Sequence, residues 1–475
     1  MSGLKLSEFQ RLDINYHYYY GSLYSLMERA GASVASTVKA KYGTGNTILV
    51  VCGHGNKAGD GLVAARILSE GNDVTVIPLR GKDSIRAHEA RTALEKYKGK
   101  FADPNDLERE IERAEIIIDA MLGTGISGEP RPPYDTAIEK INASGANKVS
   151  IDVPSGFLSS LAIKPNVTVT FHDVKEGMTP ENSGEIEIAD VGIPHSLYGV
   201  SGPGDYIYYP EPKSNSHKGM NGVLGIIGGW TYHGSAAIAA MGALSIGTDL
   251  VDVIVPPDKV SIIASYSPEI IVRSFGESIL LDSAENINRL IKRYSAMLIG
   301  PGLGNDRQIK RLFTKIVQNV RVPCIIDADG IRMLAGEIPL FSGRKFIFTP
   351  HEGEFRTLTG MGASERNAVA FAKKSGSIVV LKGREDIITD GHDVFKTSGG
   401  NARLTMGGTG DLLAGIIGGL ISRGMPAVEA SRLATFVEKK TAEELFKEKG
   451  YWYSVSDMIN KLPFVMKEIK EFTGR

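Results

Sequence analysis

Short apolar runs, many of them β-branched, alternate along the first half of the chain with longer segments of helical pattern. The runs cover residues 48–51, 74–77, 116–119, 149–153, 167–171 and 185–189. Most are apolar on both faces, which is typical of buried parallel strands. Residues 61–70 and 85–97 between them have helical patterns. This alternation predicts a Rossmann-like, doubly wound α/β domain.

The second half begins a new alternation of the same kind. Strand-type runs cover residues 223–227, 251–255, 297–299, 324–327, 345–349 and 378–381, and helix-type segments cover 411–421, 427–446 and 455–470. Between the halves, residues 199–222 are rich in Gly, Pro, Ser and Tyr, which is typical of a passage between domains. We therefore predict two α/β domains, residues 1–208 and 209–475, as the length of 475 residues also suggests.

Composition and charge narrow the class of protein. The chain has 54 Lys and Arg against 55 Asp and Glu, a balance that argues against a coat for nucleic acid or an anionic membrane. Its two cysteines, Cys52 and Cys324, are far apart, which argues against a disulfide scaffold or a cysteine zinc site. We see neither a signal peptide nor an apolar stretch long enough to span a bilayer. We expect a cytoplasmic protein with no nucleic-acid or membrane partner.

A glycine-rich segment in the second half carries candidate chemistry. Residues 407–410 read Gly-Gly-Thr-Gly and lead through Asp411 into an apolar helix-type segment. Backbone N–H groups at a helix start suit a phosphate, and no Lys-Ser/Thr follows as in a Walker A loop. Asp411 is either a helix cap or a base that takes a proton from a hydroxyl. Residues 300–304, 349–354 and 381–386 each follow a strand-type run, where open α/β sheets bind ligands.

These segments make the second half resemble the ribokinase-like superfamily and, more closely, the ADP/ATP-dependent NAD(P)H-hydrate dehydratases. The matching pieces are Lys218-Gly219, Gly228-Gly229, GPGLG from Gly300, PHEGE from Pro350, LKG from Leu381 and GGTGD from Gly407. The resemblance implies that a phosphate passes from ADP, with Mg²⁺, to the hydroxyl of hydrated NADH or NADPH and then leaves. It implies Asp411 as catalytic base, substrate contacts at Ser235, Gly302, His351 and Asp411, and nucleotide contacts at Lys382, Gly383, Arg384, Glu385, Asp386 and Gly410.

Two places depart from that family's pattern. Arg384-Glu385-Asp386 is more charged than the usual small polar residues. Thr248-Asp249-Leu250 replaces a small residue followed by Gly-Leu, and Asp249 either lies at the surface or reaches the site.

In the first half, residues 52–61 read CGHGNKAGDG, follow a strand-type run and open a helix. The segment is typical of a phosphate- or amide-binding turn, although Ala58 breaks the GxGxxG pattern. Asp119 and Asp152 each end a strand-type run. The two carboxylates could share a pocket as acid, base or cation ligands, or each could cap the following turn.

This half resembles the NAD(P)H-hydrate epimerase domain from about residue 10 to 195. The matching pieces are the segments 26–31, 56–61, 119–125 and 152–156, then Thr170-Phe171 with Lys175 and Gly177, and finally 189–194. The resemblance implies Asp152 as a catalytic residue and potassium ligands at Asp119 and Ser155. The substrate-lining set that it implies is Asn56, Lys57, Ala58, Gly59, Asp60, Gly123, Thr124, Gly125, Ile126, Ser127, Gly128, Glu129 and Asp152.

Lys57 is the main departure in this half, because the family's Asn-Asn-Gly-Gly-Asp-Gly reads Asn-Lys-Ala-Gly-Asp-Gly here. A lysine side chain offers no acceptor to a potassium ion. Its ammonium could replace the ion and pair with Asp119, or swing to solvent and leave potassium fewer ligands. A third outcome is that the epimerase half has lost its activity.

The order of the two halves resembles that of the bifunctional NAD(P)H-hydrate repair enzymes. It implies that the first half interconverts the R and S hydrates, NADHX and NADPHX. The second half would dehydrate the S form with ADP, giving NAD(P)H, AMP and phosphate. We also expect a homo-oligomer. The alternative is a ribokinase-like small-molecule kinase whose N-terminal domain only binds a ligand.

Overall fold

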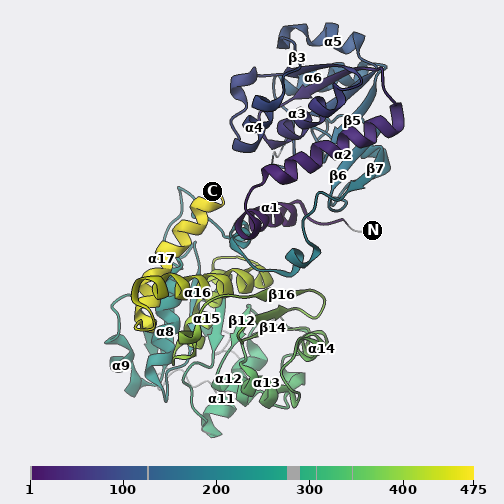
Figure 1. Ribbon diagram of the computed structural model, residues 1–475. Helices are drawn as coiled ribbons and strands as arrows, with labels where there is room; N and C mark the ends of the chain where they lie inside the picture. Colours follow the sequence, from purple (N-terminus) through teal and green to yellow (C-terminus); the bar gives the residue numbers. More distant parts are fainter. Residues whose placement is uncertain (1–2, 126–127, 275–288, 306, 345, 475) are drawn as a thin grey trace. The chain divides into compact units, whose positions relative to one another are not determined.

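The computed structural model describes residues 3–125, 128–274, 289–305, 307–344 and 346–474 and divides the chain into two compact units, Met1–Leu197 and Tyr198–Arg475 (Figure 1). Residues 201–207, within the expected passage between domains, are buried in the second unit. Asp205 there forms a buried ion pair of 2.8 Å with Arg432. The predicted boundary at 208 and 209 therefore falls inside the second unit.

The first unit contains a parallel sheet of seven strands in the order β3-β2-β1-β4-β5-β6-β7. The strands are β1 (Thr47–Cys52), β2 (Asp73–Pro78), β3 (Lys100–Phe101), β4 (Ile116–Ala120), β5 (Asn147–Ile151), β6 (Val167–Phe171) and β7 (Glu185–Ala189). The strand order reverses between β1 and β4. In such sheets the carboxyl ends of the strands beside this switch point form the ligand crevice.

The first unit has seven α-helices among the described residues, and five of them, α2 to α6, cover the two faces of the sheet. The seven are α1 (Leu6–Tyr20), α2 (Tyr24–Tyr42), α3 (Asn56–Leu68), α4 (His88–Lys96), α5 (Leu107–Arg113), α6 (Tyr134–Ala143) and α7 (Pro180–Ser183). Because side chains alternate along a strand, Ile48 and Val50 of β1 pack with α2, α3 and α4, whereas Leu49 and Val51 pack with α5 and α6. This two-sided burial explains why the strand is apolar throughout.

The second unit contains a sheet of nine strands in the order β10-β9-β8-β11-β12-β13-β14-β15-β16. They are β8 (Val223–Ile227), β9 (Leu250–Val255), β10 (Ile271–Ser274), β11 (Ala296–Ile299), β12 (Cys324–Ile326), β13 (Phe346–Phe348), β14 (Ile378–Leu381), β15 (Asp386–Thr389) and β16 (Val394–Thr397). The pairings from β10 to β14 are parallel, and β15 and β16 add an antiparallel edge.

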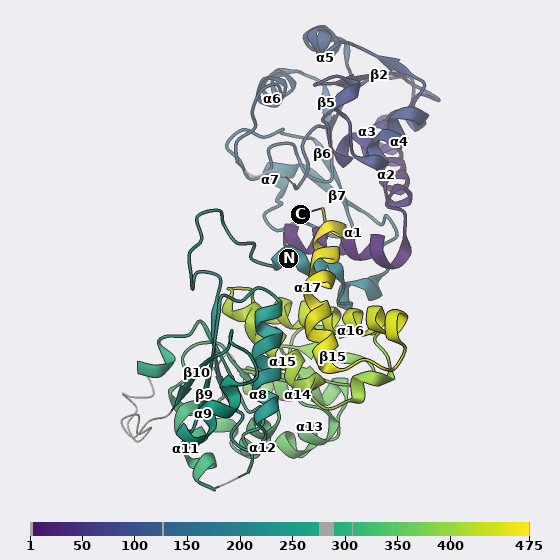
Figure 2. The ribbon, with the colours of Figure 1, turned by 90° about the vertical axis from the view of Figure 1, so that its left-hand side faces the viewer.

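Two groups of helices cover the second sheet, as Figures 1 and 2 show. One group is α8 (His233–Ser245), α15 (Thr409–Ser422), α16 (Ala427–Lys449) and α17 (Val455–Phe472), and the other is α11 (Arg307–Asn319), α12 (Asp329–Met333), α13 (Glu352–Thr359) and α14 (Glu365–Ser375). The short helix α9 (Val260–Ala264) precedes β10. None of the helices in the described ranges has both the length and the apolar character needed to cross a membrane.

The predicted α/β class with two domains is confirmed, with several local corrections. Helix α3 begins at Asn56 rather than residue 61, because the predicted turn forms the helix's first turn. Strand β5 ends at Ile151 rather than residue 153, because Asp152 adopts a positive φ of 63°. Strands β3, β10, β15 and β16 were not predicted. Lys345, the first residue of one predicted strand, lies outside the described residues.

Candidate active sites

A cavity of about 440 Å³ opens at the carboxyl ends of the central strands in the first unit. The predicted substrate residues that line it are Asn56, Lys57, Asp60, Gly123, Thr124, Gly125 and Asp152. Further titratable side chains line it too. His54 comes from the segment 52–61 and Lys175 from the epimerase match, whereas the sequence had not singled out Asp13, Glu89 and His172. Residues of the segments 56–60 and 123–125 therefore line the same cavity. It lies at the carboxyl ends of the strands, where ligands bind in sheets of this kind.

Other residues of the predicted substrate set lie elsewhere. Ala58 and Gly59 lie on the buried side of α3, where a Cβ on Gly59 would come within 2.4 Å of Met27 Sδ in α2. Glu129 is exposed and accepts hydrogen bonds of 3.0 Å from the amide and the hydroxyl of Ser160. Gly128 beside it is also exposed and has a positive φ of 88°. Ile126 and Ser127 lie outside the described residues.

Asp152 is held on the cavity wall by an ion pair with Lys175. The Lys175 side chain is buried and donates hydrogen bonds of 2.8 Å to Thr170 Oγ1 and to the Phe171 carbonyl. Its ammonium also lies 4.3 Å from the centre of the Phe9 ring. With its partners fixed in this way, Lys175 positions the Asp152 carboxylate. The sequence pointed to Lys175 through the resemblance to the epimerase domain, whose pattern it matches together with Thr170-Phe171 and Gly177.

The cavity also contains groups with shifted protonation. Burial, and then the nearby Asp152 carboxylate, raise the pKa of Asp60 well above its usual range. Burial, and then the Lys175 ammonium, lower the pKa of His172 to about 4. A carboxylate in an ion pair and a carboxyl that favours its protonated form therefore face the same space. Such an arrangement suits proton transfer in both directions.

Asp119 does not line this cavity, although it ends the strand beside β5. Its Oδ2 accepts hydrogen bonds from the Ser155 amide at 2.8 Å and from the Ser150 hydroxyl at 3.0 Å. Lys57 Nζ lies 3.1 Å from the same oxygen. Asp119 and Asp152, which the sequence placed at neighbouring strand ends, therefore have different partners.

In the second unit, the loop after β11 lies against the start of α8. Gly302 has a positive φ of 63°, and its carbonyl accepts hydrogen bonds from the amides of Thr231 at 2.9 Å and Tyr232 at 3.1 Å. A Cβ at Gly302 would meet the Tyr232 carbonyl at 2.1 Å and Ser235 Cβ at 3.1 Å. Two of the predicted substrate positions, Gly302 and Ser235, are therefore adjacent.

Lys382 joins three of the predicted motifs. Its amide donates to the Pro350 carbonyl at 2.8 Å, and its Nζ lies 3.0 Å from Asp327 Oδ1 and 4.0 Å from Glu354 Oε2. A Cβ on Gly410 would lie 3.0 Å from the same ammonium. Burial would lower the pKa of Lys382, but the carboxylates of Asp327 and Glu354 outweigh it and raise that pKa. A charged ammonium thus stands beside the glycine-rich start of α15.

Asp411 is the third residue of α15, and Gly408 is the residue that caps the helix. This excludes the interpretation of Asp411 as the N-cap. Burial, and then the Asp327 carboxylate, raise the pKa of Asp411 to about 7, against the lowering effects of a Ser235 hydrogen bond and the Lys382 ammonium. A general base is most effective when its pKa lies near the working pH, so Asp411 is suited to that role.

The remaining predicted contacts have structural partners. His351 caps α13, accepting a hydrogen bond of 3.0 Å from the Gly353 amide. Residues 383–385 form an exposed turn, and Glu385 accepts from the Ser398 hydroxyl at 2.8 Å. Asp386 is buried, accepts from the Gly383 amide at 2.9 Å and pairs with Lys439 at 3.2 Å. These contacts fix the shape of the turn after β14.

Asp249, whose place the sequence left open, holds the turn that contains the Lys218-Gly219 match. It accepts hydrogen bonds from the amides of Gly219 at 2.8 Å and Asn221 at 3.0 Å. Asp327, to which the sequence assigned no role, faces both Lys382 and Asp411. Its place at the end of the strand-type run 324–327 was the available signal.

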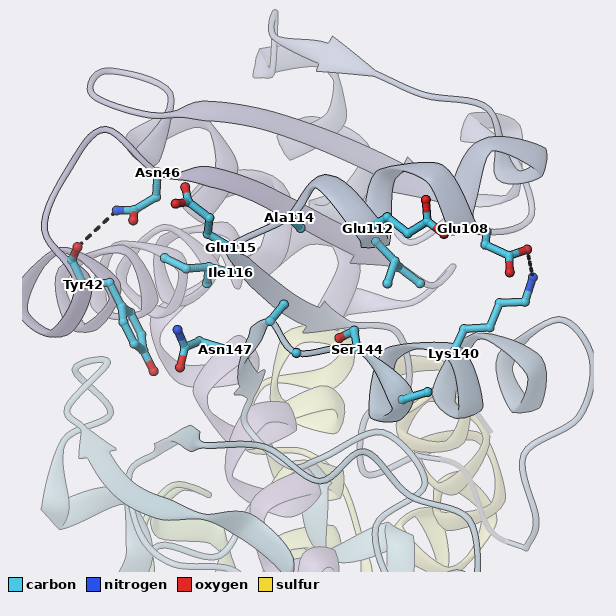
Figure 3. A pocket seen from close by; sticks show the side chains of 14 residues that line it. Tyr42, Asn46, Glu108, Glu112, Ala114, Glu115, Ile116, Lys140, Ser144 and Asn147 are labelled. Carbon is cyan, nitrogen blue, oxygen red and sulfur yellow. Dashed lines mark hydrogen bonds and ion pairs between the residues drawn. The ribbon is translucent and has the colours of Figure 1, made fainter.

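A second hollow in the first unit, of about 780 Å³, lies at the amino ends of the strands (Figure 3). Ile116 and Asn147, the first residues of β4 and β5, line it. Its charged side chains include Glu108 and Lys140, which pair at 2.8 Å. None of the predicted site residues lines this hollow. It lies at the amino ends of the strands, whereas the cavity with Asp152 lies at their carboxyl ends.

Both halves of the chain match known proteins. A family model described as NAD(P)H-hydrate dehydratase matches residues 224–463, and one described as YjeF-related protein N-terminus matches residues 23–177. A solved ribokinase-like superfamily protein from Enterococcus faecalis is 26% identical, with a TM-score of 0.50, over 56% of this chain and 94% of its own. The ADP/ATP-dependent NAD(P)H-hydrate dehydratase from Bacillus subtilis, co-crystallised with ATP/Mg²⁺, is 26% identical over 56% of this chain and 96% of its own, with a TM-score of 0.49.

The similarity extends over the whole chain in one curated relative. The bifunctional NAD(P)H-hydrate repair enzyme of Archaeoglobus fulgidus is 35% identical over 481 residues, which cover 99% of this chain and 100% of the relative. With both halves matched in the same order, the chain belongs to the family of bifunctional NAD(P)H-hydrate repair enzymes.

Proposed function

We propose that the protein repairs hydrated NADH and NADPH through two reactions. The first unit interconverts the R and S hydrates, and the second dehydrates the S form with ADP to give NAD(P)H, AMP and phosphate. The observation that carries the proposal is the full-length match to a bifunctional repair enzyme. It is supported by an ionisable carboxylate, Asp411, beside an ammonium and a glycine-rich helix start in the second unit.

The residues around the start of α15 fit a nucleotide phosphate. A Cβ on Gly410 would lie only 3.0 Å from the Lys382 ammonium. Because Gly410 has no side chain, a bound group has room beside that ammonium. The amides of the first helical turn add partial positive charge at the same place. When bound, ADP supplies the phosphoryl group that turns the substrate hydroxyl into a leaving group.

Magnesium fits this site as a companion of the nucleotide. Within the part of the chain that the structure describes, no three His, Cys, Asp or Glu side chains group to hold a metal ion alone. Mg²⁺ is commonly held by one or two carboxylates together with substrate phosphates. We therefore assign the ion to the phosphates of the bound nucleotide rather than to a preformed protein site.

Asp411 acts as the base in the dehydration. It accepts the proton of the substrate hydroxyl as that oxygen forms its bond to phosphorus and the bond between phosphorus and the nucleotide breaks. Loss of phosphate from the ring carbon, with a proton from the neighbouring carbon, restores the ring double bond. Ser235, which donates to Asp411, and Gly302 beside it hold the substrate.

In the first unit, Asp152 and Asp60 exchange protons with the hydrated ring. Asp152, paired with Lys175, accepts a proton, and Asp60, whose pKa is raised by burial, donates one. Interconversion matters because hydration produces both epimers and the second unit uses one. The two activities together allow the whole damaged pool to be recovered.

Separated epimers of hydrated NADH test the proposal. The protein is mixed with one epimer, Mg²⁺ and either ADP or ATP, and the return of the reduced-nicotinamide absorbance is followed. We expect immediate recovery from the S epimer and slower but complete recovery from the R epimer. No recovery from either, together with phosphorylated product in place of the reduced ring, would favour the small-molecule kinase.

A further inference from the structure

The ammonium of Lys57 is enclosed by oxygen atoms from two loops of the first unit. Its Nζ lies 2.7 Å from the Val153 carbonyl, 3.1 Å from the Leu122 carbonyl, 3.1 Å from Asp119 Oδ2 and 3.2 Å from Ser155 Oγ. Asp119 belongs to β4, Leu122 follows β4, Val153 and Ser155 follow β5, and Lys57 lies in the first turn of α3. The side chains of Lys57 and Asp119 are only 5% and 1% exposed. We call this set of four oxygens the oxygen cage.

The cage is built independently of the lysine. The Ser155 amide donates to Asp119 Oδ2 at 2.8 Å, the Ser150 hydroxyl donates to the same oxygen at 3.0 Å, and the Leu122 amide donates to Ser155 Oγ at 2.8 Å. The oxygens are therefore fixed toward one point. A carboxylate, a hydroxyl and two main-chain carbonyls directed at one point are ligands for a hard cation.

Outside the cage, the Asp152 and Asp60 carboxylates also favour a positive charge at that point, but more weakly than Asp119 does. Lys57 is the second residue of α3, where the helix dipole repels a cation. Burial also lowers the pKa of Lys57, and the Asp119 carboxylate opposes that effect. An ammonium has three hydrogens, so the four oxygens use its full donor capacity. The cage is thus the feature that holds the charge in this place.

The resemblance to epimerase domains implies potassium at Asp119 and Ser155, and the residues present do not fit it. The Lys57 ammonium lies among the same oxygens, and two positive charges a few ångströms apart repel. We propose that Lys57 is a built-in cation, which ties the start of α3 to the loops after β4 and β5 and makes a bound potassium ion unnecessary. Shortening Lys57 then converts the cage into a site for K⁺ or another monovalent cation.

This inference concerns the cage and does not depend on the proposed epimerisation. Its test therefore uses two readouts that need no activity. The first is hydrogen exchange of the full-length protein, followed by mass spectrometry in segments 53–60, 119–125 and 153–156. The second is anomalous scattering from crystals grown in RbCl, because Rb⁺ substitutes for K⁺ and is located directly.

The variants are Lys57→Asn, which removes the ammonium and leaves room in the cage, and Lys57→Met, which fills the same space with an apolar chain. Lys98→Asn, at an exposed position of the same unit, controls for the loss of one positive charge. All are measured in KCl and in choline chloride at one ionic strength. The epimerisation rate is recorded beside them.

We expect parent and Lys98→Asn to exchange equally in both salts, within about twofold. In Lys57→Asn, hydrogen exchange in the three segments should be about tenfold slower in KCl than in choline chloride. This holds at a K⁺ concentration about ten times the dissociation constant of K⁺ for the cage. Lys57→Met should exchange faster than the parent in both salts, with no response to K⁺. A Rb⁺ peak should lie inside the cage of Lys57→Asn and be absent from the parent.

A Rb⁺ peak among these four oxygens in the parent, or K⁺-dependent exchange of the parent segments, would overturn the proposal. So would a folded Lys57→Asn without K⁺-specific protection. If Lys57→Asn does not fold in either salt, the parent crystals decide alone by the presence or absence of the peak. A parent with the expected exchange and scattering but no epimerisation would leave the cage established and refute the proposed function of this unit.

Discussion

Asp411 should destabilise the folded second unit at neutral pH, and replacing it with asparagine should remove that cost along with the activity. Its pKa is raised from 3.8 to about 7 by burial and by the Asp327 carboxylate. Between pH 4 and 7 the folded protein therefore holds a proton that the unfolded chain has released. Stability contributed by that bound proton is present at low pH and is lost as the pH rises through this window.

The magnitude follows from the two pKa values. A rise from 3.8 to about 7 corresponds to about 4 kcal/mol, at 1.36 kcal/mol for each pH unit. Asp411 is only partly buried, so water reduces this cost. We expect Asp411→Asn to be more stable than the parent by about 2–4 kcal/mol at pH 8 and by about 0 at pH 4. Loss of the base should lower the dehydration rate about 10²–10⁴-fold.

Urea unfolding followed by tryptophan fluorescence measures this effect in the second unit alone, because both tryptophans, Trp230 and Trp452, belong to it. Asp457→Asn provides a control of opposite sign. A Lys449 ion pair and the Ser454 amide lower the pKa of Asp457 to about 2, so its charge stabilises the protein above pH 3.8. That variant should lose about 1 kcal/mol at neutral pH.

The reasoning is refuted if Asp411→Asn is as stable as the parent at both pH values, or if it retains dehydration within tenfold of the parent. A parent whose kcat/KM does not rise between pH 6 and 8 would also contradict it, because the carboxylate forms in that range. Loss of activity with no gain in stability would instead favour a residue that binds substrate without being the base.

Three further changes test other parts of the molecule. Lys382→Met should raise the KM for ADP at least about tenfold by removing a charged contact to phosphate, whereas Lys396→Met, whose ammonium pairs with Glu365 and Glu385, should change it less than twofold in the same initial-rate assay. Asp152→Asn should slow epimerisation at least about 100-fold, with dehydration of the S epimer unchanged, as measured by feeding each epimer separately. A fragment of residues 198–475 should fold and dehydrate the S epimer. A fragment of residues 211–475 should have a free energy of unfolding in urea that is lower by about 3–5 kcal/mol, because it lacks Asp205 and therefore the buried ion pair with Arg432.

Much of the fold could be predicted because the central strands are buried on both faces. Strands β6, β8 and β14 have the predicted bounds, and so does the partly exposed edge strand β7, whose residues alternate in polarity. The strands that were missed lie at sheet edges or, for β15, next to one, and their short length and mixed polarity give no clear period. β3 has two residues, and β15 begins with the buried but charged Asp386. Their pairing partners, rather than their own residues, determine that they are strands.

The candidate sites could be predicted only in part, for a related reason. Motifs such as residues 56–60 and 407–411 lie beside strand ends, and the fold brings strand ends together. The partners that set their chemistry come from distant segments. Lys175 acts on Asp152 through the ion pair, and Asp327 raises the pKa of Asp411 although no local pattern connects them. The roles assigned to these residues stay predictions.

A comparison of Lys57 and Lys382 shows how two similar lysine–aspartate pairs can serve different purposes. Lys57 pairs with Asp119 at 3.1 Å, and Lys382 pairs with Asp327 at 3.0 Å. The Lys57 side chain is 5% exposed and has four oxygen neighbours, so its donors are used within the protein. The Lys382 side chain is 18% exposed, and among the described residues its ammonium has one hydrogen bond, to Asp327. An ammonium with spare donors beside a glycine can bind a phosphate, whereas a fully enclosed one can only stabilise the loops around it.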